Sequence, residues 1–422
     1  MTGHLSFNAA DNLDAAEIDR INADFYGRFN YPWRALSLTG HADPTFAPRL
    51  LCQEAGDFDG AALPPDGEIW VAGCGTNQAV ITALRFPGAR VLGTDLSARS
   101  LALAEASARD LGLTNLWLEQ ASLNDAPHEA RFDHVICTGV IHHNAEPAQP
   151  LARLARALKP GGVMELMVYN YYHRIQTTAF QKAIRLLSGA GGRGGLIEAE
   201  LPMAQEMVTD FPLPGTMADF LAAQRGLPEP AVADSLLQPV EFSYSVETLA
   251  ALCAGSGLVL WQPCVNQFDR LSGQFGWEPP LTGASAAAFN RLPDLERWQV
   301  ANLLMQERSP MLWFYIGHGP KRRTRAEVNA DFLRRSFAPA RCEVVSHVLG
   351  PEGHYQPSPR RAALPAPALP ADPQVRAVCQ ACDGHRSMAE VLAGLGPMPD
   401  EAGLTRLRQM LTTPAFPYLL AT

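Results

Sequence analysis

The residues with the clearest chemistry are two closely spaced glycines and an aspartate that follows them. The apolar run Ile69–Ala72 leads into Gly73 and Gly75, and Asp95 lies twenty positions past Gly75. Glycine lacks the Cβ that would hold a ligand away from the backbone. A carboxylate at the end of the next strand can accept hydrogen bonds from both hydroxyls of a ribose. The order strand, glycine turn, helix, strand, carboxylate therefore predicts a nucleoside-binding site.

The residue three positions after the second glycine narrows the choice of nucleoside. A dinucleotide site usually has a third glycine there, which lets the helix pack closely over a pyrophosphate. This chain has Gln78 instead. The missing glycine favours a mononucleoside ligand, and a nicotinamide-dependent oxidoreductase is kept as the less favoured alternative.

Two adjacent histidines, His142 and His143, follow the expected strand Phe132–Thr138. An imidazole has a suitable pKa for a general base near neutral pH. The alternative is a structural pair whose rings bond to the backbone or to a cofactor. Because strand ends meet at one edge of a parallel sheet, we expect Asn170 and Tyr171 to lie nearby.

An aromatic-rich segment, residues 25–33, precedes the glycine turn and contains Tyr26 and Tyr31. Aromatic faces attract cations, so the segment is interpreted as a lid over a positively charged ligand. The alternative is that it packs the N-terminal helix onto the next domain. The catalytic candidates are His142, His143 and Tyr31; the substrate-binding candidates are Tyr31, His143, Asn170 and Tyr171.

Strands and helices alternate around these residues, which predicts an α/β protein with a doubly wound, mostly parallel sheet. The expected strands of the first part are Glu68–Ala72, Arg90–Thr94, Leu116–Gln120, Phe132–Thr138 and Val163–Tyr169. Two more strands are expected at Leu258–Cys264 and Met311–His318.

Four motifs occur in order within residues 66–175: VAGCGTN at 71–77, GTDLS at 93–97, FDHVICTGVIHH at 132–143 and LKPGG at 158–162. Together they resemble the class I S-adenosylmethionine-dependent methyltransferases, and the resemblance extends more loosely to 245–320. It implies a Rossmann-like, seven-stranded sheet with one antiparallel strand, which fits the two late strands.

The resemblance implies S-adenosyl-L-methionine as the cofactor, with S-adenosyl-L-homocysteine as the product. It implies that the glycine turn lies against the methionyl and ribose parts, that Asp95 holds the ribose and that Leu96 packs on adenine. The full set implied to bind the cofactor is Tyr26, Gly73, Cys74, Gly75, Thr76, Asn77, Gln78, Asp95, Leu96, Ser122, Leu123, Thr138, Gly139 and Val140.

Two residues depart from the family pattern. Asn77 replaces the usual third glycine of the turn, and Asn tolerates left-handed backbone angles. Ser122 stands where the family usually has an aspartate that binds the adenine amine. We therefore expect the contact at Ser122 to be weaker, or to come from Asn124 or Asp125.

The expected reaction is in-line displacement of a methyl group onto an O or N nucleophile of a small molecule or peptide, which requires the nucleophile to be held close to the methyl carbon. The alternative is a non-catalytic module that binds S-adenosylmethionine and contacts a partner through residues 321–422. The same region is the expected site of any homo-oligomer contact.

Charge, apolar runs and cysteine spacing argue against a nucleic-acid-binding, membrane-spanning, secreted or metal-binding protein. The chain has 34 basic and 43 acidic residues, a formal charge of −9, which argues against an extended nucleic-acid surface. No apolar run approaches the ~18 residues of a membrane span. The N-terminus has no signal-peptide pattern and the eight cysteines are sparse, so we expect a cytoplasmic protein with reduced thiols. The lone pair Cys379 and Cys382 predicts no metal site.

Changes in composition suggest six regions. They are a helical N-terminal lid (1–50), the cofactor-binding core (51–175), a helical insertion that caps the substrate (176–245), the completion of the core sheet (246–320), a basic then Pro/Ala-rich linker (321–373), and a small helical or winged-helix-like module (374–422).

Overall fold

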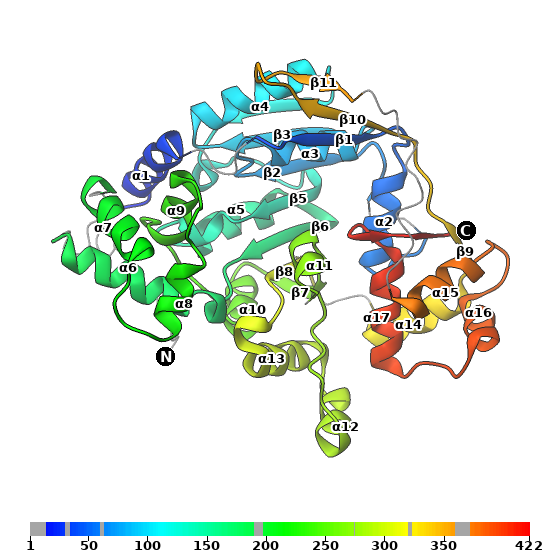
Figure 1. The fold of residues 1–422 in the computed structure, drawn as a ribbon. Helices are drawn as coiled ribbons and strands as arrows, with labels where there is room; N and C mark the ends of the chain where they lie inside the picture. Colours follow the sequence, from blue (N-terminus) through cyan, green and yellow to red (C-terminus); the bar gives the residue numbers. More distant parts are fainter. Residues whose placement is uncertain are drawn as a thin grey trace.

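The computed structural model describes residues 14–29, 34–59, 63–189, 197–273, 275–319, 323–358 and 372–422. At its centre lies a seven-stranded sheet with the order β4-β3-β2-β5-β6-β8-β7 (Figure 1). Strand β8 is antiparallel to both of its neighbours, and the other strands run parallel. The strands are β2 (Glu68–Ala72), β3 (Arg90–Asp95), β4 (Leu116–Gln120), β5 (Phe132–Thr138), β6 (Leu158–Val168), β7 (Leu258–Pro263) and β8 (Leu312–His318). The predicted fold class is confirmed.

The central strand β2 shows why these sequences form a sheet covered on both faces. Successive side chains of a strand point to opposite faces. Trp70 and Ala72 belong to one buried apolar cluster, and Ile69 and Val71 belong to another. Both faces need helices, which is the usual situation for a parallel sheet.

Helices cover the two faces of the sheet separately. The first face carries α5 (Ala148–Ala157), α10 (Val246–Ala254) and α13 (Asp294–Met305), whose buried residues share one core. The second face carries α2 (Phe46–Glu54), α3 (Gln78–Arg85) and α4 (Ala98–Asp110). Short 3-10 turns follow several of these strands and helices in the described residues: η1 (Leu123–Asp125), η2 (Ile141–His143), η3 (Tyr171–His173) and η4 (Gln306–Arg308).

A helical bundle stands beside the carboxyl end of the sheet, shown in green with α1 next to it in Figure 1. Its members are α1 (Ala15–Arg28), α6 (Ile175–Leu187), α7 (Ile197–Thr209), α8 (Thr216–Ala222) and α9 (Glu229–Leu236). They share a separate apolar core that includes Phe25, Phe180 and Leu236. The predicted lid helix and the predicted insertion therefore fold together as one unit, although the sheet strands separate them in sequence.

The prediction of a linker at 321–373 is wrong for residues 323–358. They form α14 (Arg325–Arg334), β9 (Phe337–Pro339), β10 (Val344–Leu349) and β11 (Tyr355–Pro357). Strand β10 pairs with β1 (Ser37–His41), so residues 1–50 also contain more than a helical lid. Composition could not reveal this pairing, because the two strands are far apart in sequence. The Pro/Ala-rich part, 359–371, lies outside the described residues.

The C-terminal module is helical, as the sequence predicts, with two short strands added. It contains α15 (Pro373–Ala381), α16 (Met388–Leu395), α17 (Glu401–Thr412), β12 (Phe416–Pro417) and β13 (Leu419–Ala421). The side chain of Gln53 on α2 joins the module to the core, because it donates to the carbonyls of Thr412 and Leu419 and accepts from the Ala421 amide.

Two short helices, α11 (Gln267–Ser272) and α12 (Gly283–Arg291), lie between β7 and α13 in sequence. None of the helices in the described part of the chain is long and apolar enough to cross a membrane.

Candidate functional site

The glycine turn after β2 has a backbone that only glycine adopts easily. Gly73 and Gly75 have φ values of 70° and 53°. The amides of Gly73 and Cys74 both donate to the Thr94 carbonyl, at 2.8 and 2.9 Å, which holds the turn against β3. A Cβ added to Gly73 would lie 2.4 Å from Cγ2 of Val140. The turn therefore passes directly against the residues that follow β5.

Asp95 ends β3 and supports the turn with its carboxylate. One oxygen accepts from the Gly75 amide and the other from the Ser97 amide, each at 2.8 Å. Burial raises the pKa of Asp95, and these backbone hydrogen bonds oppose the rise. Each oxygen accepts two hydrogen bonds, so acceptor capacity remains on the side that faces the adjacent cavity.

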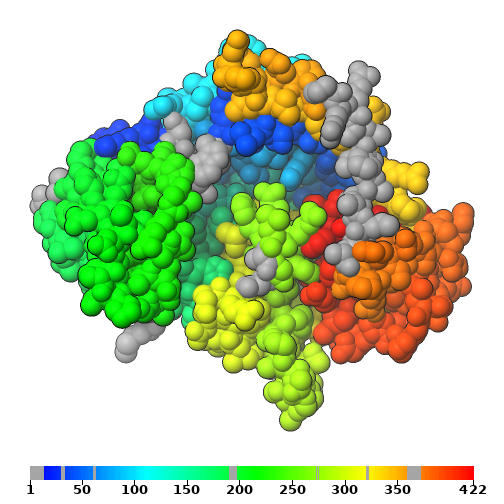
Figure 2. Space-filling view, viewed as in Figure 1, coloured from blue at the N-terminus to red at the C-terminus, as the bar shows by residue number. Residues whose placement is uncertain are grey.

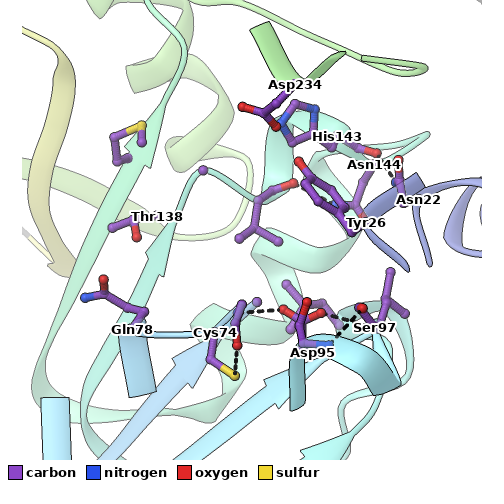
Figure 3. A pocket seen from close by; sticks show the side chains of 18 of the residues that line it. Asn22, Tyr26, Cys74, Gln78, Asp95, Ser97, Thr138, His143, Asn144 and Asp234 are labelled. Atoms are coloured by element: carbon purple, nitrogen blue, oxygen red, sulfur yellow. Dashed lines mark hydrogen bonds between the residues drawn. The ribbon is translucent and has the colours of Figure 1, made fainter. Parts of the chain in front are cut away.

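A cavity of about 490 Å³ lies at this end of the sheet, within the ~300–1,000 Å³ range of small-molecule sites. Figure 3 shows side chains from the turn, from the strand ends and from the helical bundle around it. In Figure 2 the surface is hollowed between the green bundle and the yellow-green segments. Twelve predicted site residues line the cavity: Tyr26, Gly73, Cys74, Gly75, Gln78, Asp95, Leu96, Leu123, Thr138, Gly139, Val140 and His143.

The two histidines after β5 occupy different environments. His143 lines the cavity, and its Nδ1 lies 2.7 Å from the Val240 carbonyl. Because a carbonyl only accepts, Nδ1 carries the proton and Nε2 keeps a lone pair. Burial lowers the pKa of His143, so the ring is neutral near pH 7.

His142 is fully buried and is not among the cavity residues; its ring packs 4.0 Å from that of Tyr169. Burial lowers its pKa well below the usual value. The structure therefore places His142 in the core and leaves His143 as the histidine that faces the cavity.

Asn170 and Tyr171 lie outside the cavity lining, contrary to the expectation from strand ends. The Asn170 amide donates to Ser309 Oγ at 2.8 Å and to the Pro310 carbonyl at 3.2 Å, and it accepts from Asn302. The antiparallel strand β8 brings residues 309 and 310 beside β6, so the Asn170 side chain serves that junction instead of the substrate pocket.

Three predicted cofactor contacts also lie outside the lining. Thr76 and Asn77 are buried beneath the turn, and Asn77 Oδ1 accepts from the Ala35 amide at 3.4 Å. Ser122 turns its hydroxyl to the carboxylate of Asp19. Tyr31 lies outside the described residues.

Several lining residues were not predicted from the sequence. Asp19 and Asn22 come from α1, Asp234 comes from α9, and Trp313 lies on β8. Their sequence spacing could have indicated part of this set. Residues three and four apart share a helix face, so Asp19, Asn22 and Tyr26 are expected on the same side of the N-terminal helix.

Asp234 brings a second titratable group to the site from the bundle. Gln238 Nε2 donates to Asp234 Oδ1 and to the Tyr26 hydroxyl, both at 2.8 Å. Burial raises the pKa of Asp234 to about 6. Figure 3 shows Asp234, His143 and Tyr26 close together at one end of the cavity.

The charged side chains among the cavity-lining residues that the structure describes are all carboxylates: Asp19, Asp95 and Asp234. A cleft lined by one sign of charge concentrates ligands of the other sign. The lining therefore favours a ligand that carries positive charge.

Comparison with known proteins matches the same part of the chain. Residues 70–164 match the family model of a methyltransferase domain. An uncharacterized protein of Synechococcus sp. is 29% identical over 69% of this chain and 66% of its own length. A ubiquinone biosynthesis O-methyltransferase of Paracidovorax citrulli is 32% identical over 25% of this chain and 45% of its own length. These alignments span from under half to about two thirds of the relatives.

A solved structure shares the fold over most of the chain. PKMT2 from Rickettsia typhi has a TM-score of 0.55 and 16% sequence identity, and the match covers 90% of this chain and 76% of that one. The same protein in complex with AdoHcy matches with a TM-score of 0.55 and 14% identity, over 86% of this chain and 75% of that one. At this identity the likeness shows the fold.

Proposed function

We propose that this chain, which belongs to the class I S-adenosylmethionine-dependent methyltransferases, transfers a methyl group to an O or N nucleophile of a small molecule or peptide. The cofactor of this family is S-adenosyl-L-methionine. The observation that carries the proposal is one cavity in which the glycine turn, Asp95 and the unprotonated Nε2 of His143 occur together. A methyltransferase domain at 70–164 does not favour the oxidoreductase alternative.

The residues present fit the cofactor. The backbone at Gly73 packs against Val140 with no room for a Cβ, and both residues line the cavity. Asp95 would hold the ribose hydroxyls, and Leu96 and Leu123 would pack against the base. The three carboxylates of the lining suit the positive sulfonium. When bound, S-adenosylmethionine supplies an electrophilic methyl group.

His143 would act as the general base for the acceptor. Its Nε2 can take the proton of a hydroxyl or ammonium group, while the bond from Nδ1 to the Val240 carbonyl holds the ring in place. A positioned base typically contributes ~10²–10⁴-fold to the rate. Asp234 is a second proton acceptor at the same end, because a pKa of about 6 leaves it mostly ionised at neutral pH.

Aromatic and thioether side chains would exclude water from the transfer. Tyr26, Tyr169, Trp313, Met167 and Met311 line the cavity together with Phe268 of α11. A dry, apolar wall strengthens the electrostatic interactions inside it and protects the reacting groups from solvent.

The proposal is tested by transfer of a tritiated methyl group from S-adenosylmethionine to lysate fractions that have been separated by size. We expect label in a fraction of small molecules or peptides. His143→Asn, which removes the base, should lower the turnover at least ~100-fold and leave S-adenosylhomocysteine affinity within about threefold. The exposed His385→Asn in the C-terminal module is the matched control.

Two results would contradict the proposal in different ways. A wild-type protein that neither binds S-adenosylhomocysteine nor labels any fraction would overturn the methyltransferase activity. Full turnover by His143→Asn would remove His143 from the mechanism and leave Asp234 as the base to be tested.

A further inference from the structure

Helix α1 presents three polar side chains to the cavity along one face. Asp19, Asn22 and Tyr26 follow each other at spacings of three and four residues, and all three line the cavity. The apolar residues Ile18 and Phe25 of the same helix are buried. By contrast, Asp24 is exposed and pairs with Arg20 on the solvent side. Helix α1 therefore has a polar face toward the cavity, an apolar face toward the core and a charged face toward the solvent.

Asn22 carries a buried acceptor that the protein does not satisfy. The side chain is 5% exposed, and its Nδ2 donates to the His143 carbonyl at 2.8 Å. This bond fixes the amide, because a flipped amide would bring two oxygens together. Asn22 Oδ1 then has no hydrogen-bond partner among the described residues. An unsatisfied buried acceptor costs about 1–3 kcal/mol, so the position calls for a donor from a ligand.

Asp19 is held over the loop that follows β4 by donors from that loop. Ser122 Oγ donates to Oδ2 at 2.5 Å, and Asn124 Nδ2 lies 3.3 Å from both carboxylate oxygens. Asn124 Nδ2 also bonds to Asn144 Oδ1 at 3.2 Å, so the loop is tied to the segment after β5. A carboxylate offers about four acceptor positions, so Oδ1 keeps capacity for one more donor.

The order of the strands indicates which part of the ligand meets these acceptors. The glycine turn follows β2, Asp95 ends β3, and Asp19 lies over the loop after β4, the next strand in the sheet. A nucleoside whose ribose is held at Asp95 and whose other substituent lies at the turn directs its base toward β4. The donor group that an adenine carries at its edge is the exocyclic amine.

We propose that Asp19 and Asn22 form an acceptor pair on α1 that recognises the exocyclic amine of the cofactor's purine. This inference rests on the proposed function, because it takes S-adenosylmethionine as the ligand. The helix that covers the cavity then also determines base specificity. In this chain the carboxylate that selects adenine is that of Asp19, which lies 103 positions before Ser122 in sequence. Ser122 itself stands where the family usually has the aspartate.

Calorimetric titration with two probes tests the pair: S-adenosyl-L-homocysteine and S-inosyl-L-homocysteine, in which a carbonyl replaces the amine. For the wild-type protein we expect the inosyl compound to bind about 10–100-fold more weakly, because its carbonyl sets an oxygen against two acceptors at the position of the amine. The proton that the inosyl base carries on N1 lies beside that carbonyl and not at the position of the amine. Asp19→Asn can turn an amide N–H toward the carbonyl, so its preference should fall below about threefold by the same energies. Asp24→Asn makes the same charge change on the exposed face and should keep the wild-type preference.

The outcomes separate this inference from the proposed function. A wild-type protein that binds neither probe overturns the proposed function. A wild-type protein that binds both probes equally overturns the acceptor pair and leaves the function standing, and this result does not depend on how well any variant folds. An Asp19→Asn protein that keeps the full preference for the adenosyl probe also overturns the role of Asp19.

Discussion

Substituting Gly73 by alanine tests the contact between the glycine turn and the residues that follow β5. Two separate effects oppose the new methyl group. Gly73 has a φ of 70°, where an L-residue with a Cβ is strained by about 1–2 kcal/mol. The added Cβ would also lie 2.4 and 2.8 Å from the two methyl carbons of Val140.

The steric effect should be substantial because Val140 has little freedom to move. A β-branched side chain has few χ1 positions, and inserting a methyl group into packed surroundings costs about 1–3 kcal/mol. Added to the backbone strain, this gives a loss of about 2–5 kcal/mol in the free energy of unfolding. Val140 lines the cavity, so any displacement that relieves the contact should also weaken S-adenosylhomocysteine binding.

Urea unfolding and calorimetric titration would measure the two consequences, with two variants to separate the causes. Gly139 has a φ of 77°, and a Cβ added there would lie 3.6 Å from its nearest neighbour, Met167 Cε. Gly139→Ala therefore measures the backbone strain without a steric clash. Gly73→Ala combined with Val140→Ala removes the two closest contacts and leaves Val140 Cβ, at 3.1 Å. We expect the double variant to recover S-adenosylhomocysteine affinity relative to Gly73→Ala. Gly73→Ala with wild-type stability and affinity would refute the reasoning.

Three further predictions concern the ribose, a buried carboxyl and the thiols. Asp95→Ala should weaken S-adenosylhomocysteine binding ~100-fold in calorimetry, because hydrogen bonds to a charged group contribute about 1.5–3 kcal/mol each. Unchanged affinity would mean that the ribose lies elsewhere. Burial raises the pKa of Glu54 to about 8 from a usual 4.5, so its stabilising effect is complete below pH 4.5 and is lost as the pH rises through 8. The wild-type free energy of unfolding should therefore fall over that range relative to Glu54→Gln, and parallel curves would contradict the shift. The eight cysteines are free and buried, and burial raises the pKa of Cys382 to about 12. A disulfide reagent at pH 8 should therefore label the thiols of the folded protein slowly and those of the urea-unfolded protein fast. Fast labelling of all thiols in the folded state would show that they are accessible.

The sheet and the side of the cavity formed by the glycine turn and Asp95 could be predicted from sequence because they depend on local patterns. Strand β5 carries the apolar run Val135–Cys137, and the turn at Gly73 and Gly75 requires backbone angles that only glycine accepts readily. Asp95 follows from the same logic, since the end of one parallel strand lies beside the end of the next.

The remaining part of the cavity depends on packing between distant segments. Asp19 and Asp234 reach it because α1 and α9 share an apolar core that no local pattern reveals. Asn170 was expected in the pocket because it follows a core strand, but its amide donates to Ser309 and Pro310, which lead into the neighbouring strand β8. The pairing of β1 with β10 was also missed, because the sequence of a strand does not indicate which distant strand it pairs with.

The β1–β10 pairing also has a consequence for how the chain is made. Thr39 and Ser346 face each other across these strands and are 307 positions apart. A ribosome that adds roughly 5–20 residues per second needs on the order of 15–60 s to make the partner of β1. During that time the backbone groups of β1 are open to pairing with other chains. We therefore expect slower synthesis to lower the soluble yield, and an early-binding chaperone to raise it.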